Sequence, residues 1–190
     1  MVHANEGTDE DQHAFWLTTS SGLKFYPKDP EGSEYRIEDI AHALSLTCRF
    51  AGQCREFYSC AEHSVLVALV AYRLNRKLGP WGLMHDASEA YVVDIPRPIK
   101  YLPEMEGYRV LERRVMSAIL KRFGLPDQEP PDVKTADRLV LRSEAETLGL
   151  LNEDWDVFDW PEIPERPVPF GPKEAETRFL EAAHDFGVIE

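Results

Sequence analysis

The chain has 190 residues, of which 43% are hydrophobic, and this is enough for one domain with a sizeable core. Its formal net charge of -13 would repel polyphosphate backbones, so the composition argues against binding to DNA or RNA polymers, although a locally basic pocket could still take a small anion. No apolar run reaches membrane-spanning length and the acidic, polar start is unlike a signal peptide, so we expect a cytoplasmic protein that does not enter the membrane.

The first predicted element is a β-hairpin within residues 14–28. Apolar and polar residues alternate loosely there, and Ser20-Ser21-Gly22 supplies a turn. Helical spacing of apolar residues then dominates the chain. Helices are expected over Ile37–Phe50, Ala61–Leu78, Trp81–Val92, Glu106–Phe123, Val133–Leu151 and Lys173–Phe186. Between them, Ile95-Pro96-Arg97-Pro98 is expected to be an extended loop, because a proline disfavours the helical conformation of the residue before it.

Residues 152–172 change character, because they hold five prolines among acidic and aromatic residues. They predict an irregular strap over the core, in which Trp155, Phe158 and Trp160 are buried. The fold class that follows is all-α, a helical bundle with a small N-terminal β-hairpin. We expect residues 1–36 to form a tail and the hairpin, 37–151 the helical core, and 152–190 the strap and a C-terminal helix packed on the same domain.

The chain has three cysteines, Cys48, Cys54 and Cys60. An odd count at this spacing argues against a disulfide framework and against a CxxC zinc site. We therefore expect free thiols in a reducing compartment.

The most informative motif is His85-Asp86, followed by Glu89 and Asp94. Histidine and aspartate are both good ligands for a divalent metal. On one helix, His85 and Glu89 would share a face at i, i+4, which puts a free carboxylate beside the two candidate ligands. A second pair, His184-Asp185, has no acidic companion ahead of it and is expected to be solvated.

Two further ligands are needed, and His63 and Asp137 are the best candidates. His63 is polar at the start of an otherwise apolar helix, and Asp137 lies on the apolar side of a later helix. Each alone is more often a capping or surface residue, or for Asp137 the partner of Arg138. Together with His85 and Asp86 they make a set of two imidazoles and two carboxylates, which suits Mn, Fe, Co or Zn and leaves positions for water and substrate.

These motifs, taken in order, resemble the HD-domain metal-dependent phosphohydrolase superfamily, and within it the 5'-deoxynucleotidase branch and the related phage dATP triphosphohydrolases. The resemblance covers residues 37–150 and rests on four segments: Ala61-Glu62-His63-Ser64, His85-Asp86-Ala87-Ser88-Glu89, Asp94-Ile95-Pro96-Arg97-Pro98-Ile99-Lys100, and Val133-Lys134-Thr135-Ala136-Asp137. It implies an all-α HD fold, a homodimer, and a divalent transition metal held by His63, His85, Asp86 and Asp137.

The resemblance also implies roles beyond the metal. Glu89 matches the acid that handles protons at the leaving group, Asp94 an acid that positions or activates water, and Arg49 a phosphate-binding arginine. Phe50 stands where the family often has a tryptophan that crowds the sugar 2' position, so this chain departs from the family there. Lys100 and Lys134 could help to neutralise a phosphate in this acidic chain, or they could be solvated surface lysines.

The function implied is hydrolysis of the 5'-phosphate from deoxynucleoside monophosphates by metal-activated water. One alternative is a triphosphohydrolase that acts on dNTPs, which more basic residues around the pocket would favour. The other is a non-catalytic HD module that binds nucleotides, against which Glu89 and Asp94 argue, because a binding module needs no proton-transfer acids.

Overall fold

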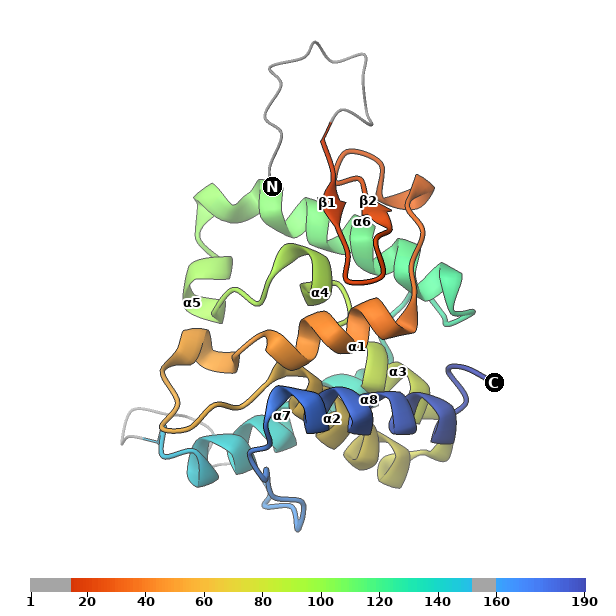
Figure 1. The fold of residues 1–190 in the computed structure, drawn as a ribbon. Coiled ribbons are helices and arrows are strands. Elements are labelled where there is room, and N and C mark those ends of the chain that lie inside the picture. Colours follow the sequence, from red (N-terminus) through yellow and green to blue (C-terminus); the bar gives the residue numbers. More distant parts are fainter. Residues whose placement is uncertain (1–14, 152–159) are drawn as a thin grey trace.

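The computed structural model describes residues 15–151 and 160–190 of the chain (Figure 1). The described part is mostly helical and carries a small antiparallel hairpin near its N-terminus, which confirms the all-α class with a β appendage. The elements are β1 (Leu17–Thr18), β2 (Lys24–Phe25), η1 (Pro30–Gly32), α1 (Ile37–Leu46), η2 (Arg49–Gly52), α2 (Cys60–Leu74), η3 (Arg76–Leu78), α3 (Gly79–Met84), α4 (Glu89–Val92), α5 (Arg97–Lys100), η4 (Pro103–Met105), α6 (Glu106–Arg122), α7 (Pro131–Thr147) and α8 (Pro172–Asp185).

The hairpin is closed by a turn at residues 19–22 and is fastened to the helices through one aromatic side chain. Leu17 pairs with Phe25, and the turn contains Gly22 at φ 86, a conformation that glycine adopts without strain. Phe25 is almost fully buried, and its ring lies 4.9 Å from that of Tyr91 in α4. The hairpin is therefore anchored in the same core as the helices.

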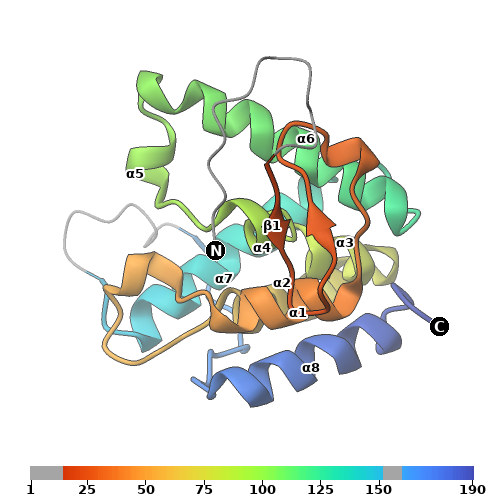
Figure 2. The same ribbon diagram turned by 45° about the horizontal axis from the view of Figure 1, so that its top comes forward.

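Helix α2 forms the centre of the bundle and contacts α1, α3, α7 and α8 (Figures 1 and 2). It begins with a capping box, in which the Ser59 hydroxyl accepts from the Glu62 amide and the Glu62 carboxylate accepts from the Ser59 amide. Its buried face is rich in small residues such as Ala68 and Ala71. Neighbouring helices can therefore approach it closely.

The closest approach is made by α3 at Gly82. A methyl group added at this glycine would lie 3.0 Å from the Cα of Ala68 and 3.0 Å from the Cβ of Ala71. The absence of a side chain at Gly82 thus fixes how near α3 can lie to the central helix. This distance matters because His85 follows directly after α3.

Three predicted helices end earlier than expected. The helix from Ile37 stops at Leu46, and α2 stops at Leu74, so Leu78 falls in a separate 3-10 turn; α7 ends at Thr147 rather than Leu151. Phe50 cannot continue α1, because it and Ala51 have positive φ angles of 57 and 50.

The expected continuous helix over Trp81–Val92 was wrong. It breaks after Met84 and resumes at Glu89, and the residues between are held by short-range bonds from the Ala87 amide to the Met84 carbonyl and from the Glu89 amide to the Asp86 carbonyl. The expected extended loop at residues 95–98 was also wrong in part. Pro96 is extended, but Arg97 begins a four-residue helix with Pro98 in its first turn, a position where a missing amide proton is tolerated.

The described part of the proline-rich segment, residues 160–171, has no helix or strand and crosses from α7 to the start of α2. Ile163 is buried against α7, and the Phe170 amide donates to the Glu62 carboxylate at 2.6 Å. Trp160 is partly buried, whereas Trp155 and Phe158 lie outside the described residues.

Helix α8 then runs alongside α1 (Figure 2). None of the helices in the described ranges combines the length and apolarity that crossing a bilayer requires.

Candidate metal centre

The four predicted metal ligands come together from three places in the fold. His63 lies in the first turn of α2, His85 and Asp86 follow α3, and Asp137 lies in α7. The His63 Nε2 atom is 3.2 Å from His85 Nε2, 3.3 Å from Asp137 Oδ1 and 3.6 Å from Asp86 Oδ2. His85 Nε2 is 3.1 Å from Asp86 Oδ2. His63, His85 and Asp86 therefore converge on one point, and Asp137 lies beside them against His63.

Hydrogen bonds at the far side of each ring define which nitrogen faces that point. His85 Nδ1 lies 2.8 Å from the Gly82 carbonyl, which can only accept, so Nδ1 carries a proton and Nε2 is the nitrogen that would bind a metal once it has lost its own proton. His63 Nδ1 lies 2.7 Å from a Glu144 carboxylate oxygen, which favours the same tautomer. Burial lowers the pKa of His85, but the charge of Asp86 outweighs it and raises the pKa to about 9.

Two nitrogen lone pairs that face each other repel unless a proton or a cation lies between them. A set of two imidazoles and two carboxylates matches the ligands that Mn, Co and Zn accept. The donor set in this chain therefore fits a divalent transition metal, and three of its members, His63, His85 and Asp86, have ligand atoms within 4.8 Å of one another.

Glu144 was missed in the sequence and is the main addition that the structure makes. It is fully buried, with one oxygen 2.7 Å from His63 Nδ1 and the other 3.2 Å from Arg49 Nη2. Burial raises its pKa, but the charges of Arg49 and His63 outweigh that effect and keep the pKa below its usual value. The available signal was its spacing: Glu144 follows Asp137 by two helical turns, so both acids lie on one face of α7.

Arg49 and Phe50 lie in the short turn η2, and Arg49 lies beside the candidate metal ligand Asp86. Arg49 Nη1 is 3.9 Å from Asp86 Oδ2, and its Nε atom is buried without a hydrogen-bond partner among the described residues. The Phe50 ring lies 5.1 Å from the guanidinium carbon. Positive φ angles at a phenylalanine and the following alanine cost about 1–2 kcal/mol each, and such strain is commonly found at functional sites.

Glu89, Asp94 and Cys60 form a second cluster of possible metal ligands. One ligand atom of each residue lies within 4.8 Å of those of the other two. Glu89 is 6% exposed, and its Oε2 atom has no hydrogen-bond partner within the described ranges. Burial raises the pKa of Glu89 well above its usual value, and the charges of Asp86 and Asp94 raise it further. Burial also raises the pKa of Asp94.

The backbone that aims Asp94 is strained. Val93 has φ 72 and ψ 146, a conformation that β-branched residues very rarely adopt, and the Tyr108 hydroxyl donates to its carbonyl at 2.7 Å. The surrounding structure therefore holds the residue before Asp94 in an unfavourable conformation.

The two lysines differ in their surroundings. Lys100 is largely buried and lies 2.5 Å from a Glu112 oxygen, so its charge is already paired. Lys134 is exposed on α7. Burial raises the pKa of Glu129, whereas the charges of His85 and Lys134 lower it, so Lys134 and His85 both lie near this acid. Lys134 thus lies on the side of α7 that faces the metal ligands, but at the surface.

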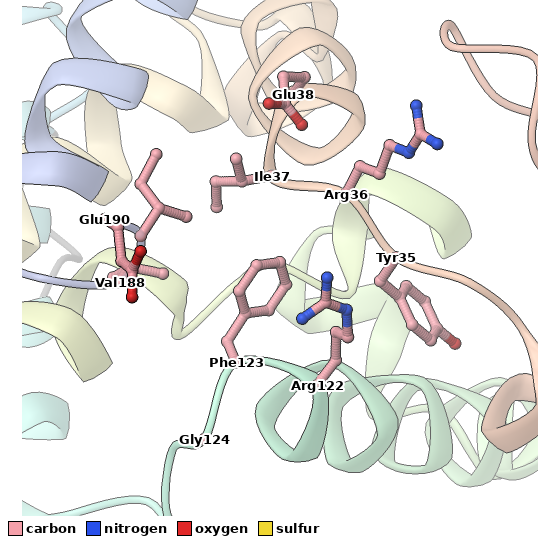
Figure 3. A pocket seen from close by; sticks show the side chains of 10 residues that line it. Tyr35, Arg36, Ile37, Glu38, Arg122, Phe123, Gly124, Val188 and Glu190 are labelled. Atoms are coloured by element: carbon pink, nitrogen blue, oxygen red, sulfur yellow. The ribbon is translucent and has the colours of Figure 1, made fainter.

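Two other features of the structure, the His184-Asp185 pair and a surface cavity, contain none of the predicted site residues. His184 and Asp185 are 3.5 Å apart and both strongly exposed, as expected for a solvated pair. A cavity of about 460 Å³ lies between the start of α1, the end of α6 and the C-terminal residues (Figure 3). Its lining includes Tyr35, Arg122 and Phe123 but none of the predicted site residues, so it is separate from the metal ligands.

Comparison with known proteins gives relatives but no family model. No protein-family model matches the chain. It is 34% identical over 181 residues to a protein of Escherichia coli K12 named Uncharacterized protein YfdR, a match that covers 92% of this chain and 97% of YfdR. It is also 36% identical over 148 residues to Uncharacterized protein RCAP_rcc00048 of Rhodobacter capsulatus, covering 73% of this chain and 75% of that protein. At this identity and coverage, the chain belongs to the same protein family as YfdR.

Proposed function

We propose that the protein is an HD-domain, metal-dependent nucleotide phosphohydrolase that removes the 5'-phosphate from deoxynucleoside monophosphates. The observation that carries the proposal is the convergence of His63, His85 and Asp86, with Asp137 against His63 and with the Nε2 atoms of both histidines facing each other. A buried pair of acids stands beside it. A divalent cation such as Mn, Co or Zn held by these four side chains would polarise a phosphoryl oxygen and lower the pKa of water.

The acid pair supports hydrolysis rather than binding alone. Burial and the charges of Asp86 and Asp94 raise the pKa of Glu89, which favours its protonated form, and a protonated Glu89 could give its proton to the nucleoside oxygen as that oxygen leaves phosphorus. Asp94 is less deeply buried and can take the proton that the attacking water loses. One carboxylate oxygen of each acid lies within 4.8 Å of the other, so a single bridging water could return the proton from Asp94 to Glu89 and complete the cycle.

The cationic groups suit a single phosphate. Arg49 is nearly buried, and its Nε atom has no hydrogen-bond partner in the part of the chain that the structure describes, so the guanidinium could bind the phosphate while its terminal nitrogens stay with Glu144 and Asp86. Phe50 stacks on that guanidinium and would lie near the sugar, where its ring would limit space at the 2' position. We assign Lys100 and Lys134 weaker, longer-range roles in attracting the anion.

The alternative of a dNTP triphosphohydrolase is less well supported. A triphosphate carries more charge than a monophosphate, so its site needs more uncompensated cations. Among the described residues near the acid pair, Lys100 is paired with Glu112 and Arg49 with Glu144. The charge available for phosphate is therefore modest.

The proposal can be tested by product analysis. Metal-stripped protein would be refilled with Mn, Co or Zn and offered dNMPs, NMPs and dNTPs, and each product would be identified. We expect orthophosphate from dNMPs. Replacing Asp86 by alanine should lower this turnover by more than about 100-fold, because a metal ligand is lost.

The chain supplies a matched control in its second His-Asp pair. Asp185→Ala removes an exposed acid beside a histidine and should leave turnover unchanged. Release of triphosphate from dNTPs would show that the protein is a dNTP triphosphohydrolase instead. Tight nucleotide binding without any product would make it a non-catalytic HD module and overturn the roles of Glu89 and Asp94.

A further inference from the structure

Two of the three thiols lie next to each other on the turn that carries Arg49. Cys48 Sγ and Cys54 Sγ are 3.8 Å apart, and both side chains are partly exposed. We propose that Cys48 and Cys54 are a site of reversible covalent modification, in which an external disulfide oxidises them to an intramolecular disulfide. This goes beyond the proposed hydrolase activity and does not depend on it.

The backbone holds the two thiols near each other. Cys48 forms an antiparallel bridge with Ser59, and the Arg49 amide donates to the Tyr58 carbonyl at 2.9 Å, so the segment between them is pinned at its base. Beyond Cys54, the Arg55 side chain lies over Gly149, where an added methyl group would approach its Nε atom to 2.5 Å. The backbone next to each of the two cysteines is therefore held in place by contacts with other segments.

Formation of the bond needs only a small movement. The sulfur atoms must approach from 3.8 Å to about 2.05 Å. The segment between them contains consecutive left-handed residues, Phe50, Ala51 and Gly52, which make a tight loop that brings the two side chains to the same side. The 3.8 Å separation therefore shows that the two side chains already point toward each other.

The chemistry is thiol–disulfide exchange with a low-molecular-weight disulfide such as oxidised glutathione. One thiolate attacks the disulfide, forms a mixed disulfide and expels one glutathione thiolate; the second cysteine then attacks the bound sulfur and expels the other. Two protein thiols lose two electrons and two protons, and the glutathione disulfide is reduced to two thiols. Burial and the adjacent Cys48 raise the pKa of Cys54, so the exchange should be slow and incubation should extend over hours.

Cys60 provides an internal contrast. It is fully buried at the start of α2, beside Glu89 and Asp94, and an external disulfide cannot reach it while the protein is folded. Oxidation of the folded protein should therefore consume two thiols and spare the third.

The experiment treats the folded, full-length protein with oxidised glutathione. We expect the free thiols, counted with Ellman's reagent after acid quenching and unfolding, to fall from three to one. The intact mass should fall by two hydrogens, and dithiothreitol should restore both values. The oxidised form should also melt about 5 °C higher, because the bond closes a short loop in the unfolded chain.

Single-cysteine substitutions distinguish a disulfide between Cys48 and Cys54 from unspecific oxidation. Cys48→Ser and Cys54→Ser should each stop at a stable glutathione adduct, because the second attacking thiol is missing, whereas Cys60→Ser should still lose two thiols and form the internal bond. A stable glutathione adduct on the wild-type protein, a disulfide that includes Cys60, or three unchanged thiols after prolonged incubation would each overturn the proposal.

Discussion

Glu144 joins two parts of the candidate site that are far apart in the sequence. One of its oxygens lies against the imidazole of His63 and the other against the guanidinium of Arg49. A carboxylate behind a metal-binding histidine fixes the ring and raises its basicity, and loss of such a partner typically lowers metal affinity 10–100-fold. We therefore expect Glu144→Gln to weaken metal binding by about 10–100-fold, measured by competition with a chelating dye.

The control for this variant lies on the same helix. Glu146 contacts Arg142 and Arg166 and none of the four ligands, so Glu146→Gln should retain the wild-type metal affinity. An unchanged affinity in Glu144→Gln would remove Glu144 from the metal centre. A loss of folding in that variant would appear in its circular dichroism spectrum and would be distinguished from a local effect.

At the scale of single residues, the sequence pointed to the candidate ligands but not to the residue that supports them. His63, His85, Asp86 and Asp137 could be named because histidines and acids on apolar helix faces are unusual. Glu144 could not, since glutamate is a common helix former and one such residue carries no signal until its partners are known. The partners, His63 and Arg49, lie 81 and 95 residues away in the chain.

Among the helices, the packing of α3 on α2 determines where His85 stands. Gly82 touches the backbone of α2, and its carbonyl accepts from the His85 ring. A methyl group there must push the helices apart by a few tenths of an ångström. We expect Gly82→Ala to destabilise the protein by about 1–3 kcal/mol, measured by urea unfolding, and to lower metal affinity as well.

Gly107 in α6 is the matched comparison, because a methyl group added there meets nothing within 4 Å. Gly107→Ala should leave metal affinity unchanged and stabilise the protein by up to about 1 kcal/mol through helix propensity. If Gly82→Ala were as harmless as Gly107→Ala, close packing of α3 would not control the site.

The break between α3 and α4 shows why this element was misjudged. Over residues 81–92, the apolar spacing is compatible with a continuous helix, and it does not distinguish an α-helix from a helix interrupted by 3-10 turns. The interruption arises where His85 and Asp86 turn toward His63 of α2, which is distant in the sequence. The presence of these helices was predictable, but their ends depended on tertiary contacts.

For the molecule as a whole, the hairpin and the helical bundle are joined by hydrogen bonds to one buried carboxylate, that of Asp39. Asp39 in α1 accepts hydrogen bonds from the hydroxyl groups of Ser20 and Ser21 and from the Ser21 amide, at 2.6–2.7 Å. Burial raises the pKa of Asp39, but these hydrogen bonds outweigh it and hold the pKa below its usual value. The charged form therefore stabilises the folded state.

The sign of the pH dependence follows from this lowered pKa. The contribution of Asp39 is fully present above the unfolded-state pKa of about 3.9 and disappears as the pH falls through the lower folded-state value. We expect Asp39→Asn to reduce the free energy of unfolding by about 1 kcal/mol at pH 7, and the difference from wild type to shrink below about pH 4.

Urea unfolding at several pH values would measure this difference, with Glu38→Gln as the control on the exposed side of the same helix. A difference that stays constant down to the lowest pH at which the protein folds would show that the charge of Asp39 does not hold the hairpin.

The bond between the Phe170 amide and Glu62 has a consequence for synthesis on the ribosome. Glu62 caps the helix turn that presents His63, and its remaining oxygen is taken by an amide that lies 108 residues further along the chain. During translation, α2, α3 and α7 emerge before residue 170, so the nascent chain carries all four candidate ligands while this end of α2 lacks one of its contacts. Metal loading should accordingly become efficient only after residue 170 has left the ribosome tunnel, which would link capture of the ion to synthesis of a segment far beyond the candidate ligands.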